Sequence, residues 1–138
     1  MLRLAAAANE QAGWNLQSAK LAPTDEMTYD RFGPSFSDVR FEWHCDDSAS
    51  GPRDISVVAY FTDPSTYEGG DLQMLLPQKE QDENKLVTRR FSPGNAVAFS
   101  SKFLKHCVTP VTAGERRSLL LLCSDRGTDS EGSYKPYM

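Results

Sequence analysis

The pattern of apolar and polar residues divides the chain into two parts. Residues 1–21 carry apolar side chains at roughly helix-like intervals, and Pro23 follows them. One face of an α-helix is lined at such spacings and a proline cannot continue the helix, so the pattern predicts a helix over residues 1–21. Gly13 weakens this helix pattern from within. The apolar positions are Leu2, Leu4, Ala5, Ala8, Ala12 and Leu16.

From residue 38 onward the apolar runs are short, and turn residues such as Gly69-Gly70 and Pro93-Gly94 separate them. Short runs that alternate, or that are rich in β-branched and aromatic residues, predict strands. Their close spacing favours an all-β sandwich or barrel, and a jelly roll among these has an open mouth that can hold a ligand. The strand candidates are Val39–Trp43, Ile55–Phe61, Leu72–Leu76, Leu86–Phe91, Ala96–Phe99, Cys107–Val111 and Ser118–Cys123.

The length of 138 residues suits one domain with one core. We therefore expect a single domain over residues 1–138. Within it, residues 1–21 are helical, residues 38–123 form the jelly-roll core and residues 124–138 form a polar tail. The sequence shows no internal repeat and no linker.

Charge and cysteine content indicate which partners and which compartment to expect for the protein. The net charge of −4 and the pI of about 5.1 give no general attraction to nucleic acid or to anionic membranes. No apolar stretch approaches the roughly 20 residues of a membrane helix. The three cysteines show no regular spacing, so a disulfide framework is not expected. We expect a cytoplasmic protein that binds neither membranes nor nucleic acid.

The chain has only two histidines, His44 and His106, so any imidazole-based site must draw on them. His44 and Asp46 end a strand candidate, and residues two apart on a strand point to the same face. His106 follows Asp46 by 60 residues, next to a later candidate, and facing strands can bring such residues together. Two imidazoles and one carboxylate can form a facial triad with open coordination positions, which points to a non-haem Fe(II) oxygenase.

Zinc is the competing metal, because Cys45 or Cys107 could join the two histidines and thiolates favour zinc. Each of these cysteines directly follows a histidine. On an extended segment, adjacent side chains point to opposite faces, so strand alternation opposes the zinc site. We interpret both cysteines as small buried apolar residues.

Arg116 follows His106 by ten residues and precedes a leucine-rich run. Its guanidinium can bond both oxygens of a carboxylate in one plane, and Ser118 would share its face on a strand. The leucines indicate that this strand runs through the core, where a buried arginine needs a partner. A dicarboxylic ligand would be one. Arg117 should point elsewhere.

Four stretches carry a further signal: Arg53–Phe61, Tyr67–Leu72, Pro93–Phe99 and His106–Arg116. Together they resemble the Fe(II)/2-oxoglutarate dioxygenases of the prolyl 4-hydroxylase type, over residues 29–123. A His-x-Asp triplet alone is a loose signature. Combined with a Gly-Gly-x-Leu turn and a histidine followed ten residues later by an arginine, it is specific.

The resemblance implies a double-stranded β-helix, which is a jelly roll, preceded here by the N-terminal helix. It also implies that His44, Asp46 and His106 are the iron ligands. By the same likeness, Arg116 matches the residue that pairs with the distal carboxylate of 2-oxoglutarate, and Ser118 would help to anchor it.

Tyr60 resembles a strand tyrosine that hydrogen-bonds the same carboxylate in relatives, with a core tyrosine as an equal alternative. Leu72 matches an apolar wall of the co-substrate pocket. The chain departs from the family in the aromatic residues before the first ligand, and Tyr29, Phe36 and Phe41 are all candidates to line the pocket.

The implied activity is an Fe(II)- and 2-oxoglutarate-dependent hydroxylation that consumes dioxygen and releases succinate and CO2. Peptidyl proline is the substrate that the likeness favours, so a protein or peptide partner is expected, and ascorbate is a compatible reductant. Two alternatives stay open. One is a metal-binding, cupin-like jelly roll without catalysis, and the other is a structural or interaction domain whose histidines never meet.

Overall fold

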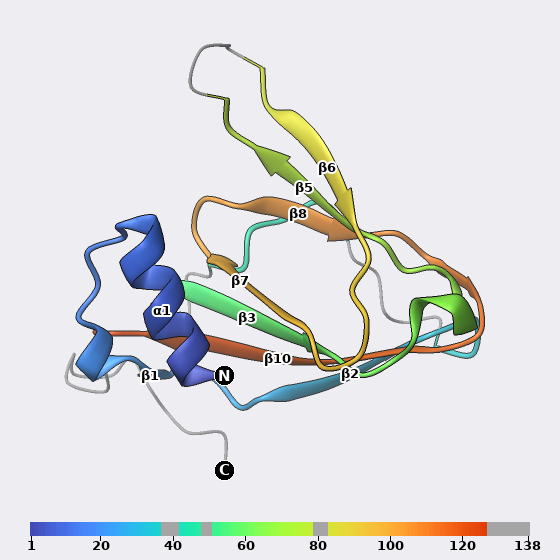
Figure 1. Cartoon of the computed structure of the whole chain (residues 1–138), viewed down its shortest axis with the longest axis horizontal. Helices are drawn as coiled ribbons and strands as arrows, with labels where there is room; N and C mark the ends of the chain where they lie inside the picture. Colours follow the sequence, from blue (N-terminus) through green and yellow to red (C-terminus); the bar gives the residue numbers. More distant parts are fainter. Residues whose placement is uncertain (37–41, 48–50, 79–82, 127–138) are drawn as a thin grey trace.

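A computed structural model describes residues 1–36, 42–47, 51–78 and 83–126 of the chain (Figure 1). The described strands form two main antiparallel sheets that face each other, and helix α1 (Leu2–Ala12) packs on the outside of the larger one. The predicted mainly β jelly roll with an N-terminal helix is confirmed.

The larger sheet is built around its last strand, β10. The strand order is β1-β10-β3-β7, and β2 also pairs with β10. β1 and β2 lie along the same edge of β10, because β1 pairs with its end and β2 with its beginning. The strands of this sheet are β1 (Ala22–Pro23), β2 (Thr28–Phe32), β3 (Ile55–Tyr60), β7 (Ala96–Ser100) and β10 (Arg116–Ser124).

The smaller sheet has the order β6-β5-β8, and Figure 1 shows its β5–β6 hairpin rising above the larger sheet. His44 forms a single antiparallel bridge with His106 on β8, so the segment around His44 lies along the outer edge of this sheet. The remaining strands are β5 (Leu72–Leu76), β6 (Lys85–Arg89), β8 (Lys105–Val108) and the short pair β4 (Glu68–Gly69) and β9 (Val111–Ala113).

Alternation along β3 separates two cores. Ile55 and Val57 face outward and are fully buried beneath α1, where they pack with Leu121 and Cys123 of β10. Successive side chains of a strand point to opposite faces. Val58 and Tyr60 therefore face the space between the sheets, which holds the second core of Leu72, Met74, Phe99 and Leu104.

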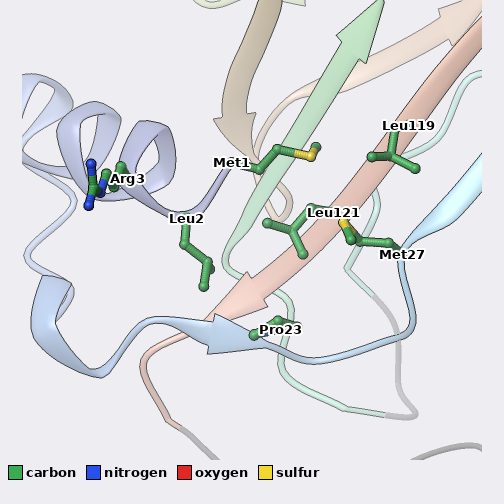
Figure 2. Close-up of a pocket in the computed structure, with 7 residues that line it drawn as sticks. All are labelled: Met1, Leu2, Arg3, Pro23, Met27, Leu119 and Leu121. Atoms are coloured by element: carbon green, nitrogen blue, oxygen red, sulfur yellow. The ribbon is translucent and has the colours of Figure 1, made fainter.

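A hollow on the outer face of the larger sheet lies beside the start of α1 (Figure 2). Its lining is mostly apolar, and it contains no cluster of polar groups. The lining residues are Met1, Leu2, Arg3, Pro23, Met27, Leu119 and Leu121.

The predicted helix over residues 1–21 is wrong beyond Ala12. Gly13 adopts a left-handed φ of 66° and its N–H caps the helix on the Asn9 carbonyl. The buried Asn9 side chain then bonds both the N–H and the carbonyl of Leu16, which turns the chain back toward the sheet. Only a short 3-10 turn, Ser18–Lys20, follows. No helix in the described ranges is both long and apolar enough to cross a bilayer.

The strand predictions differ from the structure at several points. Pro110 divides the candidate Cys107–Val111 between β8 and β9. Most of the candidate Val39–Trp43 lies outside the described residues, and His44 makes one bridge instead of ending a strand. Ser124 belongs to β10 and is fully buried, so the polar tail does not begin there. Strands β1, β2 and β4 were not predicted.

Candidate metal and co-substrate site

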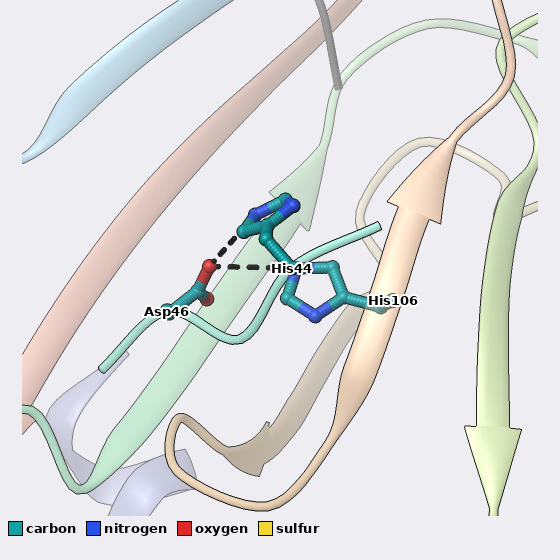
Figure 3. Close-up of side chains that lie close together, drawn as sticks. All are labelled: His44, Asp46 and His106. Carbon is teal, nitrogen blue, oxygen red and sulfur yellow. Dashed lines mark ion pairs between the residues drawn. The ribbon is translucent and has the colours of Figure 1, made fainter. Parts of the chain in front are cut away.

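His44, Asp46 and His106 converge at the edge of the smaller sheet (Figure 3). The backbones of His44 and His106 hold each other through two hydrogen bonds, each 2.9 Å from N–H to carbonyl oxygen. Because the two residues are directly paired, their rings lie side by side with centroids 4.4 Å apart. Asp46 reaches the same point from two residues beyond His44.

The three side chains present one compact set of ligand atoms. Nε2 of His44 lies 3.1 Å from Asp46 Oδ1, and Nε2 of His106 lies 3.4 Å from the same oxygen. Each Nδ1 lies against a backbone carbonyl, Glu42 at 2.6 Å and Leu104 at 3.0 Å. A carbonyl oxygen can only accept, so Nδ1 carries the proton and Nε2 keeps its lone pair for a metal.

Asp46 is held by groups on both of its oxygens. The Ser56 hydroxyl donates to Oδ2 at 2.5 Å, and the Ser101 hydroxyl oxygen lies 2.7 Å from the Ser56 hydroxyl oxygen. Burial alone would raise the pKa of Asp46, but hydrogen bonds from the protonated form of His106 and from Ser56, together with the imidazole charges, lower it overall; a metal would take the place of the Nε2 protons. An ionised carboxylate with Oδ1 turned toward two free Nε2 atoms can bind a divalent cation.

The cysteines do not join this cluster. Within the described parts of the chain, His44, Asp46 and His106 form the one group of potential ligand side chains whose atoms lie within 4.8 Å of one another. Cys107 points to the other face of β8, where its thiol lies 3.5 Å from the Gln73 side-chain oxygen. The set of two imidazoles and one carboxylate suits iron(II) better than a thiolate zinc site.

The inner face of β10 and the neighbouring strand β3 carry the second half of the site. Arg116 and Ser118 are 3% and 2% exposed. The Arg116 guanidinium carbon lies 4.6 Å from the Phe32 ring centre and 5.0 Å from that of Tyr60. These two aromatic rings hold the guanidinium inside the barrel.

Two buried polar atoms at this end of the pocket have no hydrogen-bond partner, Nε of Arg116 and the hydroxyl of Tyr60. Burial raises the pKa of Tyr60 against the effects of the Arg116 charge and of its nearby N–H groups, so the hydroxyl stays protonated and can donate. Unpaired buried donors are costly unless a ligand completes them. Their chemistry fits the carboxylate of a bound dicarboxylic acid.

One pocket connects the two halves and contains every residue that was predicted to bind the metal or the co-substrate. His44, Asp46 and His106 lie in the same lining as Arg116 and Ser118. Tyr60 and Leu72 also belong to it. Sequence reasoning missed the other lining residues: Asp30, Phe32, Val58, Phe99, Val108 and Leu120.

Among the described residues that precede His44, Phe32 is the aromatic residue that lines the pocket, and it was not among the candidates. Tyr29 is 53% exposed and contacts Phe61 on the surface. Phe36 lies beneath the Arg31 guanidinium, and Phe41 is outside the described residues. A period of two along Thr28–Phe32 could have identified Phe32, since it places Phe32 and Asp30 on one face.

Residues 28–122 match the family model described as the 2OG-Fe(II) oxygenase superfamily. A PKHD-type hydroxylase of Synechococcus sp. (strain CC9605) is 37% identical over 78 residues, which are 55% of this chain and 32% of that protein. A PKHD-type hydroxylase of Maricaulis maris is 40% identical over 75 residues, 53% of this chain and 31% of that protein. The chain thus spans about a third of the length of these relatives.

Solved structures show the same fold. A Pseudomonas putida prolyl-4-hydroxylase superposes with a TM-score of 0.62 at 24% identity, covering 90% of this chain and 61% of that one. A prolyl 4-hydroxylase from Phytophthora capsici gives a TM-score of 0.60 at 18% identity, covering 95% and 42%.

Proposed function

Because the chain belongs to the 2OG-Fe(II) oxygenase superfamily, we propose that it is an Fe(II)- and 2-oxoglutarate-dependent dioxygenase that hydroxylates its substrate. The observation that carries the proposal is the content of a single pocket. Three ligand atoms converge at one end, and the buried Nε of Arg116 and the buried hydroxyl of Tyr60, both without a hydrogen-bond partner, lie at the other. A metal alone would need only the first end.

In this proposal His44, Asp46 and His106 hold the iron. Three ligands leave coordination positions free for a co-substrate and dioxygen. Bound iron would couple the oxidative decarboxylation of 2-oxoglutarate, with release of succinate and CO2, to hydroxylation of the substrate. The protein's own contribution is to orient the ligands, and the backbone pairing of the two histidines supports that role.

Arg116 and Ser118 would bind the distal carboxylate of 2-oxoglutarate, and Tyr60 would donate a further hydrogen bond to it. The unpaired atoms of Arg116 and Tyr60 support this assignment, since a carboxylate would complete both. Leu72, 3% exposed, would pack against the carbon chain of the co-substrate. No acid–base pair of the protein is required.

For the substrate we propose a peptidyl proline or a related peptide side chain. The support is the likeness to proteins named PKHD-type hydroxylase and prolyl-4-hydroxylase. Ascorbate would serve as the reductant. We also propose that residues 1–138 act as one domain in the cytoplasm. The free thiols of Cys45, Cys107 and Cys123 agree with a reducing compartment.

The test is release of succinate and CO2 from 2-oxoglutarate by the iron-loaded protein under oxygen, followed by a screen of proline-containing peptides. We expect turnover in the wild type and none in His44→Ala. Arg117→Ala is the matched control, because this neighbour of Arg116 is exposed, and it should retain activity. Stoichiometric iron binding without succinate would instead identify a non-catalytic, cupin-like module.

A further inference from the structure

Asp30 has a position in this pocket that the proposed function does not explain. It lies on β2, directly opposite Ser118 on β10, and Ser118 in turn lies opposite Tyr60 on β3. Three adjacent strands therefore set Asp30, Ser118 and Tyr60 in one row, and all three line the pocket. Arg116 lies in the next row, diagonal to Asp30 on the same face, within reach of a long side chain.

This row is the anchor end of the pocket and is distant from the metal end. Ser56, which touches Asp46, and Tyr60 are four residues apart on β3, roughly 13 Å at the usual rise of a strand. The pocket lining holds two carboxylates, and Asp46 belongs to the triad. Asp30 is thus the acid beside the guanidinium, at the place where a distal carboxylate would bind.

The charged groups around Asp30 determine its protonation state. Asp30 lies diagonal to Arg116 of β10 and shares the pocket lining with Tyr60 of β3, while His44, Asp46 and His106 lie at the far end of the same pocket. Burial raises the pKa of Asp30 and the charge of Arg116 opposes this rise. Asp30 is the carboxylate on this face of the sheet whose charge can offset that of the buried guanidinium.

We propose that Asp30 is the counter-ion of Arg116 in the free protein, and that it takes up one proton from solvent when a dicarboxylic 2-oxo acid binds. The inference rests on the proposed function. One guanidinium cannot fully neutralise a bound carboxylate and the partly buried Asp30 at the same end of the pocket, so the complex favours a proton on one of the two. The ligand carboxylate then accepts two hydrogen bonds from the Arg116 guanidinium, and Asp30 becomes a neutral neighbour that can form a hydrogen bond. Asp30 then sets how co-substrate affinity depends on pH.

The direction of the pH dependence follows from the linkage between ligand binding and proton uptake. The pKa of Asp30 is higher in the complex than in the free protein, because the bound carboxylate pairs with Arg116 in place of Asp30. The ligand also brings a second negative charge close to Asp30. Proton uptake on binding makes the affinity fall as the pH rises between these two values, and the slope approaches tenfold in Kd per pH unit. A 2-oxo acid whose distal group is an uncharged amide needs no proton.

The test is isothermal titration calorimetry of 2-oxoglutarate into the Fe(II)-loaded protein without oxygen. Titrations in buffers of different ionisation enthalpy count the protons taken up, and titrations across the neutral range give the pH slope. We expect about one proton for the wild type. None is expected for Asp30→Asn, whose Kd should be independent of pH and lower than that of the wild type at alkaline pH. Asp30→Ser repeats the test with a shorter neutral side chain.

Glu115→Gln is the matched control. Glu115 is a neighbour of Arg116 in sequence, but it pairs with Arg31 outside the pocket at 2.7 Å. This variant removes one negative charge and should keep the proton uptake of the wild type. The 5-amide of 2-oxoglutarate should bind the wild type without proton uptake, since it is identical at the metal-binding end.

Three results would overturn this inference and leave the proposed function intact. They are wild-type binding of 2-oxoglutarate without proton uptake, unchanged uptake in Asp30→Asn, and loss of affinity in Asp30→Asn at every pH. If the wild type shows no binding of 2-oxoglutarate that depends on metal, the proposed function fails, and the role of Asp30 fails with it.

Discussion

The two ends of the pocket differ in whether their polar atoms are paired within the protein. At the metal end Asp46 contacts both imidazoles and accepts from Ser56, and each Nδ1 of the histidines lies against a backbone carbonyl. At the anchor end Arg116 Nε and the Tyr60 hydroxyl are buried without a hydrogen-bond partner. The same barrel therefore holds one completed network and one incomplete one.

The difference indicates how each end is organised. The histidines are fixed by backbone pairing between the segment 42–47 and β8, so the backbone itself sets the positions of the two imidazoles. Arg116 is held between two aromatic rings, and its Nε has no hydrogen-bond partner, which leaves this donor for a ligand. Pre-organisation at the first end and unmet donors at the second both favour binding of a metal-chelating dicarboxylate.

The largest effect should come from breaking the metal end. His106→Ala removes one of three ligands, and we expect metal affinity to fall by more than about 100-fold and turnover to disappear. The exposed neighbour Lys105 supplies the control, because Lys105→Ala changes the same strand outside the pocket. Metal binding by competition with a chelator measures both. Retained affinity in His106→Ala would remove His106 from the site.

The next effect concerns the anchor end. Arg116→Lys keeps the charge but loses the planar fork, so we expect KM for 2-oxoglutarate to rise about 10- to 100-fold with metal affinity unchanged. The same exchange at the exposed Arg117 should leave KM as it is. Steady-state kinetics checks the prediction, and an equal KM in both variants would contradict the role of Arg116.

A smaller effect is expected from Ser56, which supports the metal end indirectly. Ser56→Ala leaves Asp46 Oδ2 without its donor, and we expect metal affinity to fall about tenfold. Ser56→Thr keeps the hydroxyl and should restore most of the affinity. A loss in both variants would indicate a packing effect instead, because Ser56 is fully buried.

The smallest effect separates the two ends most sharply. Tyr60→Phe removes an unpaired hydroxyl, so the free energy of unfolding of the ligand-free protein should rise by roughly 1 kcal/mol. KM for 2-oxoglutarate should rise several-fold, because the donor is used only in the complex. Denaturant unfolding and kinetics on the same samples test both. Destabilisation would show that the Tyr60 hydroxyl is already paired in the free protein.

The residues that could be predicted from the sequence are those whose chemistry is rare in this chain. Two histidines and one following aspartate left few ways to build a metal site, and the structure brings all three together. The geometry behind that prediction was wrong, because His44 makes a single bridge instead of ending a strand. The pairing with His106, not strand alternation, positions the ligands.

Asp30 and Phe32 were missed for a physical reason. They lie on β2, which among the described strands pairs with β10 alone, and exposed Tyr29 and Arg31 alternate with them. A strand of five residues with two charges carries little apolar signal, and its inward face is defined by its neighbour. The helix was overestimated because Gly13 and Asn9 end it through contacts that periodicity does not reveal.

The central claim is that one pocket binds the metal and 2-oxoglutarate together. The most direct measurement is the Kd of 2-oxoglutarate with and without Fe(II) in the absence of oxygen. Because the two ligands would share a contact, each must strengthen the binding of the other, and we predict at least about tenfold tighter binding with metal. An equal Kd in the presence and absence of Fe(II) would contradict the account.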